Sequence, residues 1–437
     1  MKIFVTGLCT LHWGRLQYGN IGNYYIIEPL FRELHRVFAN AEIITTFQMT
    51  EEFCEAENVT VLPMEWYYNW DEQDLENAKN EYRLAKEAKG KQDGRFTPYM
   101  NTVLKSSLVI NVSGDMWGDN AEHVGKNRFE VDLYKMRTAQ LLGTKTVLFA
   151  GTPGPFYACK NIDFAKEVYS HFDLVINREP TSTQNLKKWN FKSDYVKDFA
   201  CPAFLYTPKL SKEENDMINQ LFDENCFGKM TIGFTIGGFN LPVGPYDMWP
   251  REDWQYDVFA EVIEHILNKY QAKVILISHT NGFELPPDFK LINGRDYPIL
   301  NQLKEVVLKR GKIKNSDDIV LLDGAYLPKV TKSIIGRFDM MITGRVHASV
   351  AAISQYVPTV FINYERSFIP STKMYGFADL AGVGEMVCEP KDLNKMKDTI
   401  DYCVENLSNI HKRLQQNIPN IKNKAQDAFD EMKKLCD

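Results

Sequence analysis

The sequence predicts an α/β protein with two Rossmann-like halves followed by a carboxyl-terminal helical segment. Apolar, β-rich runs alternate with helix-length segments almost from end to end, which is typical of βαβ units and parallel sheets. The chain of 437 residues is too long for one ordinary core, and its 44% apolar content is enough for two. We therefore expect domains at 1–215 and 228–390, with helices at 391–437 packing across both.

Ten apolar runs have the length and composition of buried strands. They cover residues 2–6, 42–46, 107–112, 145–150, 173–177, 230–236, 273–278, 318–322, 339–343 and 359–363. The polar segment 207–229 separates the first five runs from the last five and is predicted to link the two halves. Segment 71–92 is rich in Glu, Lys and Asn, which predicts a solvated helix face.

Composition argues against several classes of function. A formal net charge of −6 provides no global attraction to nucleic acid, so no nucleic-acid partner is expected. The amino terminus lacks a signal-peptide pattern and no apolar run has membrane-spanning length, which predicts a cytoplasmic protein. The eight cysteines lack metal-type spacing, and no acidic cluster has it either, so neither a metal nor a cofactor is expected.

Arg345 and His347 stand between a predicted strand and a predicted helix at 348–354. Ligands of open α/β sheets bind where strands end, and helix starts attract anions. Arg345 adds a planar cation, Gly344 and Ser349 flank the turn, and His347 can titrate near neutral pH. The segment predicts an anion site with a proton donor; a structural histidine beside a surface arginine is the alternative.

Two other turns predict sugar contacts. The Gly-Asn-Ile-Gly-Asn turn with Asn20 and Asn23 can bring backbone close to a ligand, or can simply join a strand to a helix. Trp117 lies between Asp115 and Asp119 after another strand. An aromatic ring flanked by carboxylates suits a sugar, and a capped surface turn is the alternative.

Arg178 and His279 follow two further strands. Arg178 precedes a helix that starts with proline and could reach the same anion as Arg345 from the other half; a pair with Glu179 is the alternative. His279 could contact a diphosphate or help to deprotonate an acceptor, or could make a loop hydrogen bond.

Several segments, in this order along the chain, resemble the polysaccharide pyruvyl transferase family. "YGNIGNYYI" is similar to its Gly-Asn-x-Gly-Asp-Glu motif, "LVINREPTSTQNL" to its Arg-Asp-x-x-Ser segment and "CPAF" to its Asp-Pro-Ala-Phe segment. "DMMITGRVHASVAAISQYVPTVFINYE" resembles its Asp-x-x-Ile-(Thr/Ser)-x-Arg-Leu-His segment, with Val346 in place of Leu. Asn23, Glu179 and Cys201 each stand where the family usually has Asp, and Tyr24 stands where an acid is common.

The resemblance implies a glycosyltransferase-B-like fold, with two Rossmann-type domains facing across a cleft. It also implies transfer of a pyruvyl group from phosphoenolpyruvate, a co-substrate, to a sugar of a polysaccharide or lipid-linked precursor, usually as a cyclic ketal. In that scheme Arg178, Arg345 and the helix start bind phosphoenolpyruvate and His347 supplies a proton. The acceptor would meet Asn20, Asn23, Asp115, Trp117, Asp119 and His279.

Two other functions remain open from the sequence. One is a nucleotide-sugar-dependent glycosyltransferase or epimerase of the same fold, and the other is a non-catalytic glycan-binding protein, which Asn23 in place of Asp keeps open. Aromatic residues around Trp66 and Trp254 could form an acceptor surface or a membrane-facing rim, so a peripheral membrane contact is a further expectation. The sequence carries no signal for an oligomeric state.

Overall fold

The chain is divided into two compact units in a computed structural model. The structure describes residues 1–7, 13–88, 96–112, 114–115, 117–121, 126–157, 161–192, 194–226, 228–244, 248, 250–364 and 372–437. Unit 1 comprises Met1–Leu16, Ile26–Leu205 and Lys422–Asp437, and unit 2 comprises Gln17–Tyr25 and Tyr206–Ile421.

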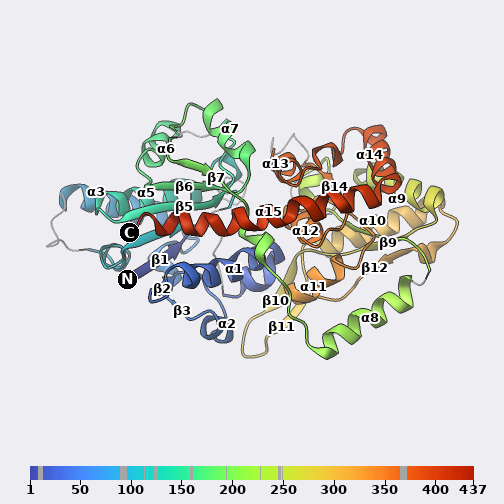
Figure 1. The fold of residues 1–437 in the computed structure, drawn as a ribbon, viewed down its shortest axis with the longest axis horizontal. Coiled ribbons are helices and arrows are strands. Elements are labelled where there is room, and N and C mark those ends of the chain that lie inside the picture. Colours follow the sequence, from blue (N-terminus) through green and yellow to red (C-terminus); the bar gives the residue numbers. More distant parts are fainter. Residues whose placement is uncertain are drawn as a thin grey trace. The chain divides into compact units, whose positions relative to one another are not determined.

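Unit 1 contains a seven-stranded parallel sheet in the order β3-β2-β1-β4-β5-β6-β7 (Figure 1). The strands are β1 Lys2–Thr6, β2 Glu42–Thr45, β3 Val59–Val61, β4 Leu108–Asn111, β5 Lys145–Gly151, β6 Leu174–Asn177 and β7 Val196–Asp198. The helices are α1 Ile21–Val37, whose first turn belongs to unit 2, α2 Glu51–Ala56, α3 Asp74–Ala88, α4 Pro98–Leu104, α5 Arg128–Leu141, α6 Ile162–Tyr169 and α7 Pro180–Lys188. The strand order reverses between β1 and β4, so the ends of these strands are where a doubly wound sheet binds ligands.

Unit 2 contains a six-stranded parallel sheet in the order β12-β9-β8-β13-β14-β15 and a separate antiparallel hairpin, β10-β11. The strands are β8 Thr231–Thr235, β9 Lys273–Leu276, β10 Asn281–Glu284, β11 Lys290–Asn293, β12 Ile319–Leu321, β13 Met340–Thr343, β14 Thr359–Ile362 and β15 Val387–Cys388. The helices are α8 Lys212–Cys226, α9 Asp257–Tyr270, α10 Asp296–Arg310, α11 Pro328–Ile335, α12 Val346–Ile353, α13 Lys373–Leu380, α14 Leu393–Glu405 and α15 Leu407–Lys433. Here the order reverses between β8 and β13.

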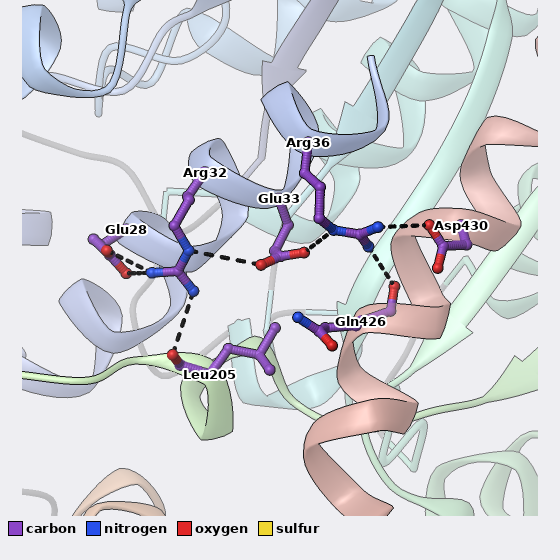
Figure 2. Close-up of polar contacts among 7 residues, drawn as sticks. All are labelled: Glu28, Arg32, Glu33, Arg36, Leu205, Gln426 and Asp430. Atoms are coloured by element: carbon purple, nitrogen blue, oxygen red, sulfur yellow. Dashed lines mark hydrogen bonds and ion pairs between the residues drawn. The ribbon is translucent and has the colours of Figure 1, made fainter. Parts of the chain in front are cut away.

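The last turns of α15 belong to unit 1, where they lie along β5 (Figure 1). The Phe429 ring is 4.9 Å from the ring of Phe149 in β5, centroid to centroid. On the surface, Arg36 of α1 donates to the Asp430 carboxylate at 3.0 Å and to the Gln426 carbonyl at 3.3 Å (Figure 2). An apolar contact and an exposed polar network thus hold the chain's end against this unit.

The structure confirms all ten predicted strands, with bounds within two residues of those expected. The prediction missed β3, β7, β10, β11 and β15, which have only two to four residues each and little periodic signal. The linking segment 207–229 contains α8. The segment 71–92 contains α3, which has the predicted solvated face and buries Ala78, Glu81 and Ala85 on its other side.

The two compact units differ from the expected domains at two segments. Residues 17–25 and 206–215, expected in the first domain, group with unit 2. The helices at 391–437, expected to pack across both domains, are divided between the units, with 391–421 in unit 2 and 422–437 in unit 1. The grouping of residues 17–25 depends on packing between segments far apart in sequence, which local composition does not encode.

Candidate active site

The turn between β13 and α12 lies at the point where the sheet order of unit 2 reverses. The helix begins at Val346, two residues before the predicted start, which makes Arg345 its N-cap residue and puts His347 in its first turn. The Arg345 N–H donates to the Thr343 hydroxyl at 2.9 Å, and the Arg345 carbonyl accepts from the Ser349 N–H at 3.0 Å. The strand exit therefore holds both candidate residues in a defined turn.

The guanidinium of Arg345 is held from two sides. Its Nη2 donates to Asp296, the first residue of α10, whose carboxylate is fully buried. Its other side lies against Gly237, which follows β8; a Cβ there would be 2.9 Å from Cζ of Arg345. Only 14% of the Arg345 side chain is exposed, so the charge is largely fixed in place.

His347 packs directly on the glycine-rich turn of the amino-terminal segment. A Cβ on Gly22 would lie 2.5 Å from Nδ1 of His347, closer than side-chain atoms tolerate. The backbone of this turn, predicted to lie close to a ligand, therefore lies close to the His347 side chain. His347 itself is partly exposed.

The segment Gln17–Tyr25 joins unit 2 through contacts at the end of β9. Asn20 forms an isolated bridge with Thr280, and its side chain caps α1 by accepting from the Gly22 N–H at 3.1 Å. Asn23 lies in the same first turn, with its N–H bonded to the Asn20 carbonyl at 2.9 Å. Both asparagines were expected on the first domain and instead lie in the unit that carries Arg345 and His347.

His279 is buried at the same edge of the unit 2 sheet. Its ring contacts that of Tyr25 edge to face at 5.6 Å, and its backbone N–H donates to Asp296 at 3.1 Å. Burial, with a smaller contribution from the Arg345 charge, lowers the pKa of His279 to about 3. The imidazole is therefore neutral at physiological pH and a weak base, which argues against the predicted role in deprotonating an acceptor.

The two other predicted donor residues of unit 2, Ser349 and Gly344, contact neighbouring parts of the protein. The Ser349 hydroxyl donates to the Val346 carbonyl at 2.6 Å within α12, so it supports the helix turn. Gly344 lies against the side chain of Asn240, which any Cβ at that position would meet. Asn240 in turn accepts from the Gly237 N–H at 2.9 Å.

The predicted residues of unit 1 lie around two interlocked loops at the ends of β4 and β5. Thr152, Gly154 and Asp119 each donate a backbone N–H across the pair of loops, at 2.8, 2.6 and 2.8 Å. Gly118 is needed there because its φ is +141° and a Cβ would lie 2.5 Å from the Pro155 carbonyl oxygen. Asp115 and Asp119 are both partly buried within these loops.

Trp117 does not form a sugar platform in this structure. Its side chain is fully buried, with the rings of Phe129, Tyr169 and Phe172 packed edge to face at 5.6, 5.2 and 5.5 Å. Its indole N–H donates to Asn111 at 3.3 Å. Protein atoms thus cover the ring, and Trp117 belongs to the core of unit 1.

Arg178 follows β6 and is buried, with its Nε donating to the Thr152 hydroxyl at 2.6 Å. The neighbouring Glu179 caps α7 by accepting from the Ser182 N–H at 3.2 Å. Burial raises the pKa of Glu179 to about 7, although the Ser182 hydrogen bonds and the charge of Arg178 act in the opposite direction. The carboxyl edge of unit 1 thus contains a group that titrates near neutrality.

Sequence reasoning missed Asp296 and Asn240, which contact or flank the Arg345 turn. Asp296 did carry a local signal, since an acid two residues before Pro298 is typical of a helix start. Nothing local indicated that its carboxylate would meet Arg345.

A cavity of about 490 Å³ lies at the opposite end of the unit 2 sheet, before β13 and β14. Its lining includes Phe338, Pro358 and His411 and none of the predicted site residues. Within the described residues, no group of three or more His, Cys, Asp or Glu side chains could hold a metal ion. No helix among the described residues is both long enough and apolar enough to cross a membrane.

A model of the polysaccharide pyruvyl transferase family matches residues 20–366. No curated protein sequence matches the chain. The matched range contains Asn20, Arg178, Arg345 and His347, and therefore spans both units.

Solved structures with a similar fold include an epimerase and a glycosyltransferase. UDP-GlcNAc 2-epimerase from Neisseria meningitidis, solved with UDP-GlcNAc, has a TM-score of 0.56 at 12% identity, with 100% of both chains covered. A glycosyltransferase from Rickettsia africae has a TM-score of 0.55 at 11% identity, covering 99% of this chain and 97% of that one. HepE from Anabaena, solved with UDP and glucose, has a TM-score of 0.55 at 13% identity, covering 99% of this chain and 100% of that one.

At such identities the likeness concerns the fold alone. Together with the two parallel sheets and the helical carboxyl-terminal segment, it confirms the glycosyltransferase-B-like class predicted from the sequence.

Proposed function

Since the chain belongs to the polysaccharide pyruvyl transferase family and is accordingly a transferase, we propose that it moves a pyruvyl group from phosphoenolpyruvate to a sugar. The sugar would be part of a polysaccharide or lipid-linked precursor, and the product a cyclic ketal. The observation that carries the proposal is the pairing of Arg345 and His347 at the start of α12, where the sheet order reverses.

Phosphoenolpyruvate carries a carboxylate and a phosphate on a small frame, so it suits a fixed guanidinium beside a helix start. Arg345 supplies the planar cation, and the first turn of α12 supplies backbone N–H groups. Arg178, which the sequence predicts as a second cation, lies in unit 1, where its Nε donates to the Thr152 hydroxyl at 2.6 Å.

His347 is proposed to protonate the methylene carbon of phosphoenolpyruvate. This step creates cationic character at the adjacent carbon, to which a sugar hydroxyl oxygen adds while losing its proton. The C–O bond to phosphate then breaks and inorganic phosphate leaves. A second sugar hydroxyl adds to the same carbon, losing its proton to phosphate or solvent, and closes the ketal. The methylene thus becomes a methyl group, and no oxidant or reductant is needed.

The position of His347 affects when it can act as an acid. A helix amino terminus disfavours an imidazolium, whereas a bound anion with several negative charges favours it. We therefore expect His347 to become protonated mainly in the complex with phosphoenolpyruvate. The pH profile of kcat should then titrate at a higher pH than that of kcat/KM; identical profiles would contradict this order of events.

Phosphate release from phosphoenolpyruvate, measured across a panel of sugars and lipid-linked precursors, tests the proposal. Release should depend on an acceptor and should fall about 10²- to 10⁴-fold in His347→Ala, with a comparable loss in Arg345→Ala. His411→Ala is the matched control, because this unit 2 histidine bonds to the Tyr356 carbonyl at 2.9 Å, beside the cavity at the other end of the sheet.

Two outcomes would redirect the assignment. Turnover of a nucleotide sugar with no use of phosphoenolpyruvate would replace pyruvyl transfer with sugar-nucleotide chemistry. If no acceptor elicits release, a thermal-shift titration with phosphoenolpyruvate decides between a missing acceptor, shown by stabilisation, and a wrong donor, shown by none.

A further inference from the structure

Asp296 is a carboxylate with no exposed surface, placed behind the cation of the candidate site. One oxygen accepts from Arg345 and the other accepts from the His279 backbone N–H at 3.1 Å. The Asp296 N–H donates to the Thr280 hydroxyl at 3.1 Å. Burying a carboxylate is costly unless it is paired and hydrogen-bonded, so these contacts keep Asp296 in one position.

The same contacts fix the orientation of the Arg345 guanidinium. Asp296 holds Nη2 at one end, and the backbone at Gly237 packs against the carbon of the guanidinium. An arginine side chain otherwise has several freely rotating bonds, so these contacts restrict the guanidinium to one orientation.

Asp296 also contacts the part of unit 2 that holds His347. Its N–H donates to Thr280, which forms the isolated bridge with Asn20, and Asn20 belongs to the turn whose Gly22 packs on His347. The His279 carbonyl accepts from the Ile21 N–H at 3.4 Å in the same turn. The buried carboxylate residue Asp296 thus holds both Arg345 and the segment that packs against His347.

We propose that Asp296 is a positioning residue, which orients Arg345 for the transition state and offsets part of its charge in the ground state. The inference rests on the proposed function of the Arg345 and His347 site. Because an interaction that serves only orientation raises kcat without tightening substrate binding, its loss should lower kcat. Because removing the carboxylate leaves the guanidinium charge less offset, anion binding should be unchanged or tighter.

Steady-state kinetics of Asp296→Asn test this inference. The substitution is nearly isosteric and removes the charge, and kcat for pyruvyl transfer should fall about 10- to 100-fold while KM for phosphoenolpyruvate stays the same or decreases. Asp339→Asn is the matched control: this acid lies before β13, at the other end of the sheet, and accepts from the Thr231 N–H at 2.7 Å. A raised KM with unchanged kcat, or wild-type values for both, would overturn the proposal.

Calorimetric binding of phosphoenolpyruvate separates failure of this inference from failure of the proposed function. If the wild type transfers no pyruvyl group to any acceptor, the inference still predicts that Asp296→Asn binds the anion at least as tightly as the wild type and that Arg345→Ala binds it at least tenfold more weakly. An equal loss in both variants would overturn it.

A second variant covers the case in which Asp296→Asn does not fold. Thr280→Val removes only the hydroxyl that accepts from the Asp296 N–H. Thr280→Val should then show the same pattern with a smaller effect, in which kcat is reduced about three- to tenfold and KM is unchanged. Wild-type kinetics in a folded Thr280→Val protein would contradict the proposal.

Discussion

Both parallel sheets of this protein have an arginine at their carboxyl edge, but the two guanidinium groups donate to different kinds of partner. In unit 2 the Arg345 guanidinium is paired with the fully buried carboxylate of Asp296. In unit 1 the Arg178 guanidinium donates to the neutral hydroxyl of Thr152 at 2.6 Å. The Thr152 hydroxyl contributes only orientation, whereas the Asp296 carboxylate both orients its arginine and offsets part of the charge.

The difference extends to the glycines. Gly22 allows a side chain, His347, to pack against backbone, whereas Gly118 allows two loop backbones to interlock. Unit 2 thus uses its glycine to place a titratable group, and unit 1 uses its glycine to shape a loop. The comparison indicates that sheet topology sets where a site can lie, while contacts between distant segments determine its chemistry.

The largest expected effect is that of Gly22→Ala. The added methyl would lie 2.5 Å from Nδ1 of His347, so the imidazole must move, and kcat for pyruvyl transfer should fall at least 100-fold. The matched control in the other unit is Gly151→Ala, whose methyl would meet no atom closer than 3.8 Å and should change kcat less than about twofold. Equal effects of the two substitutions would remove the contrast between the edges.

The next largest effect concerns the pH dependence of stability. The pKa of Glu179 is raised from 4.5 to about 7 in the folded protein, so between these values the folded state binds more protons than the unfolded chain. Its stability must then fall as pH rises through this window. Glu179→Gln mimics the protonated form and should be more stable relative to wild type at pH 8 than at pH 5, by about 2 kcal/mol. Urea unfolding of both proteins at the two pH values measures this, and parallel pH dependences would contradict it.

A smaller effect is expected from Thr152→Val, which removes the hydroxyl that accepts from Arg178. Losing a hydrogen bond from a charged donor should lower the free energy of unfolding by about 1–2 kcal/mol. Urea unfolding of the variant and the wild type measures this change. An unchanged free energy of unfolding would show that the hydroxyl does not stabilise the buried Arg178 side chain.

The smallest effect is expected at the surface network of unit 1 (Figure 2). Arg36 and Asp430 are 41% and 47% exposed, so solvent screens their 3.0 Å ion pair. Asp430→Ala should change the free energy of unfolding by less than about 1 kcal/mol and leave transfer activity unchanged. A fall in kcat as large as the one expected for Asp296→Asn would show that burial does not distinguish the two ion pairs.

Much of the fold could be predicted because its signal is local. A buried parallel strand is a short apolar run, and the ten apolar runs predicted as strands were all strands, whereas the five strands of two to four residues with little periodic signal were missed. The burial of Trp117 could not be predicted, because its aromatic neighbours come from residues after it in the chain and are brought together by α5 and α6. The flanking acids predicted that the Trp117 ring would contact a sugar, but the core of unit 1 covers this ring.

The sequence by itself determined the two parallel sheets and the position of Arg345 and His347 at a strand exit, because strand length, apolar pattern and turn residues are encoded within a few positions. Only the tertiary structure decided that Asp296 would pair with Arg345 and that Gly22 would pack on His347. Those partners lie many residues apart, and no local preference selects one of the many acids or glycines in the chain. The partner is determined only when the unit folds, because a buried charge needs an opposite charge next to it and a closely packed ring needs a neighbour without a side chain.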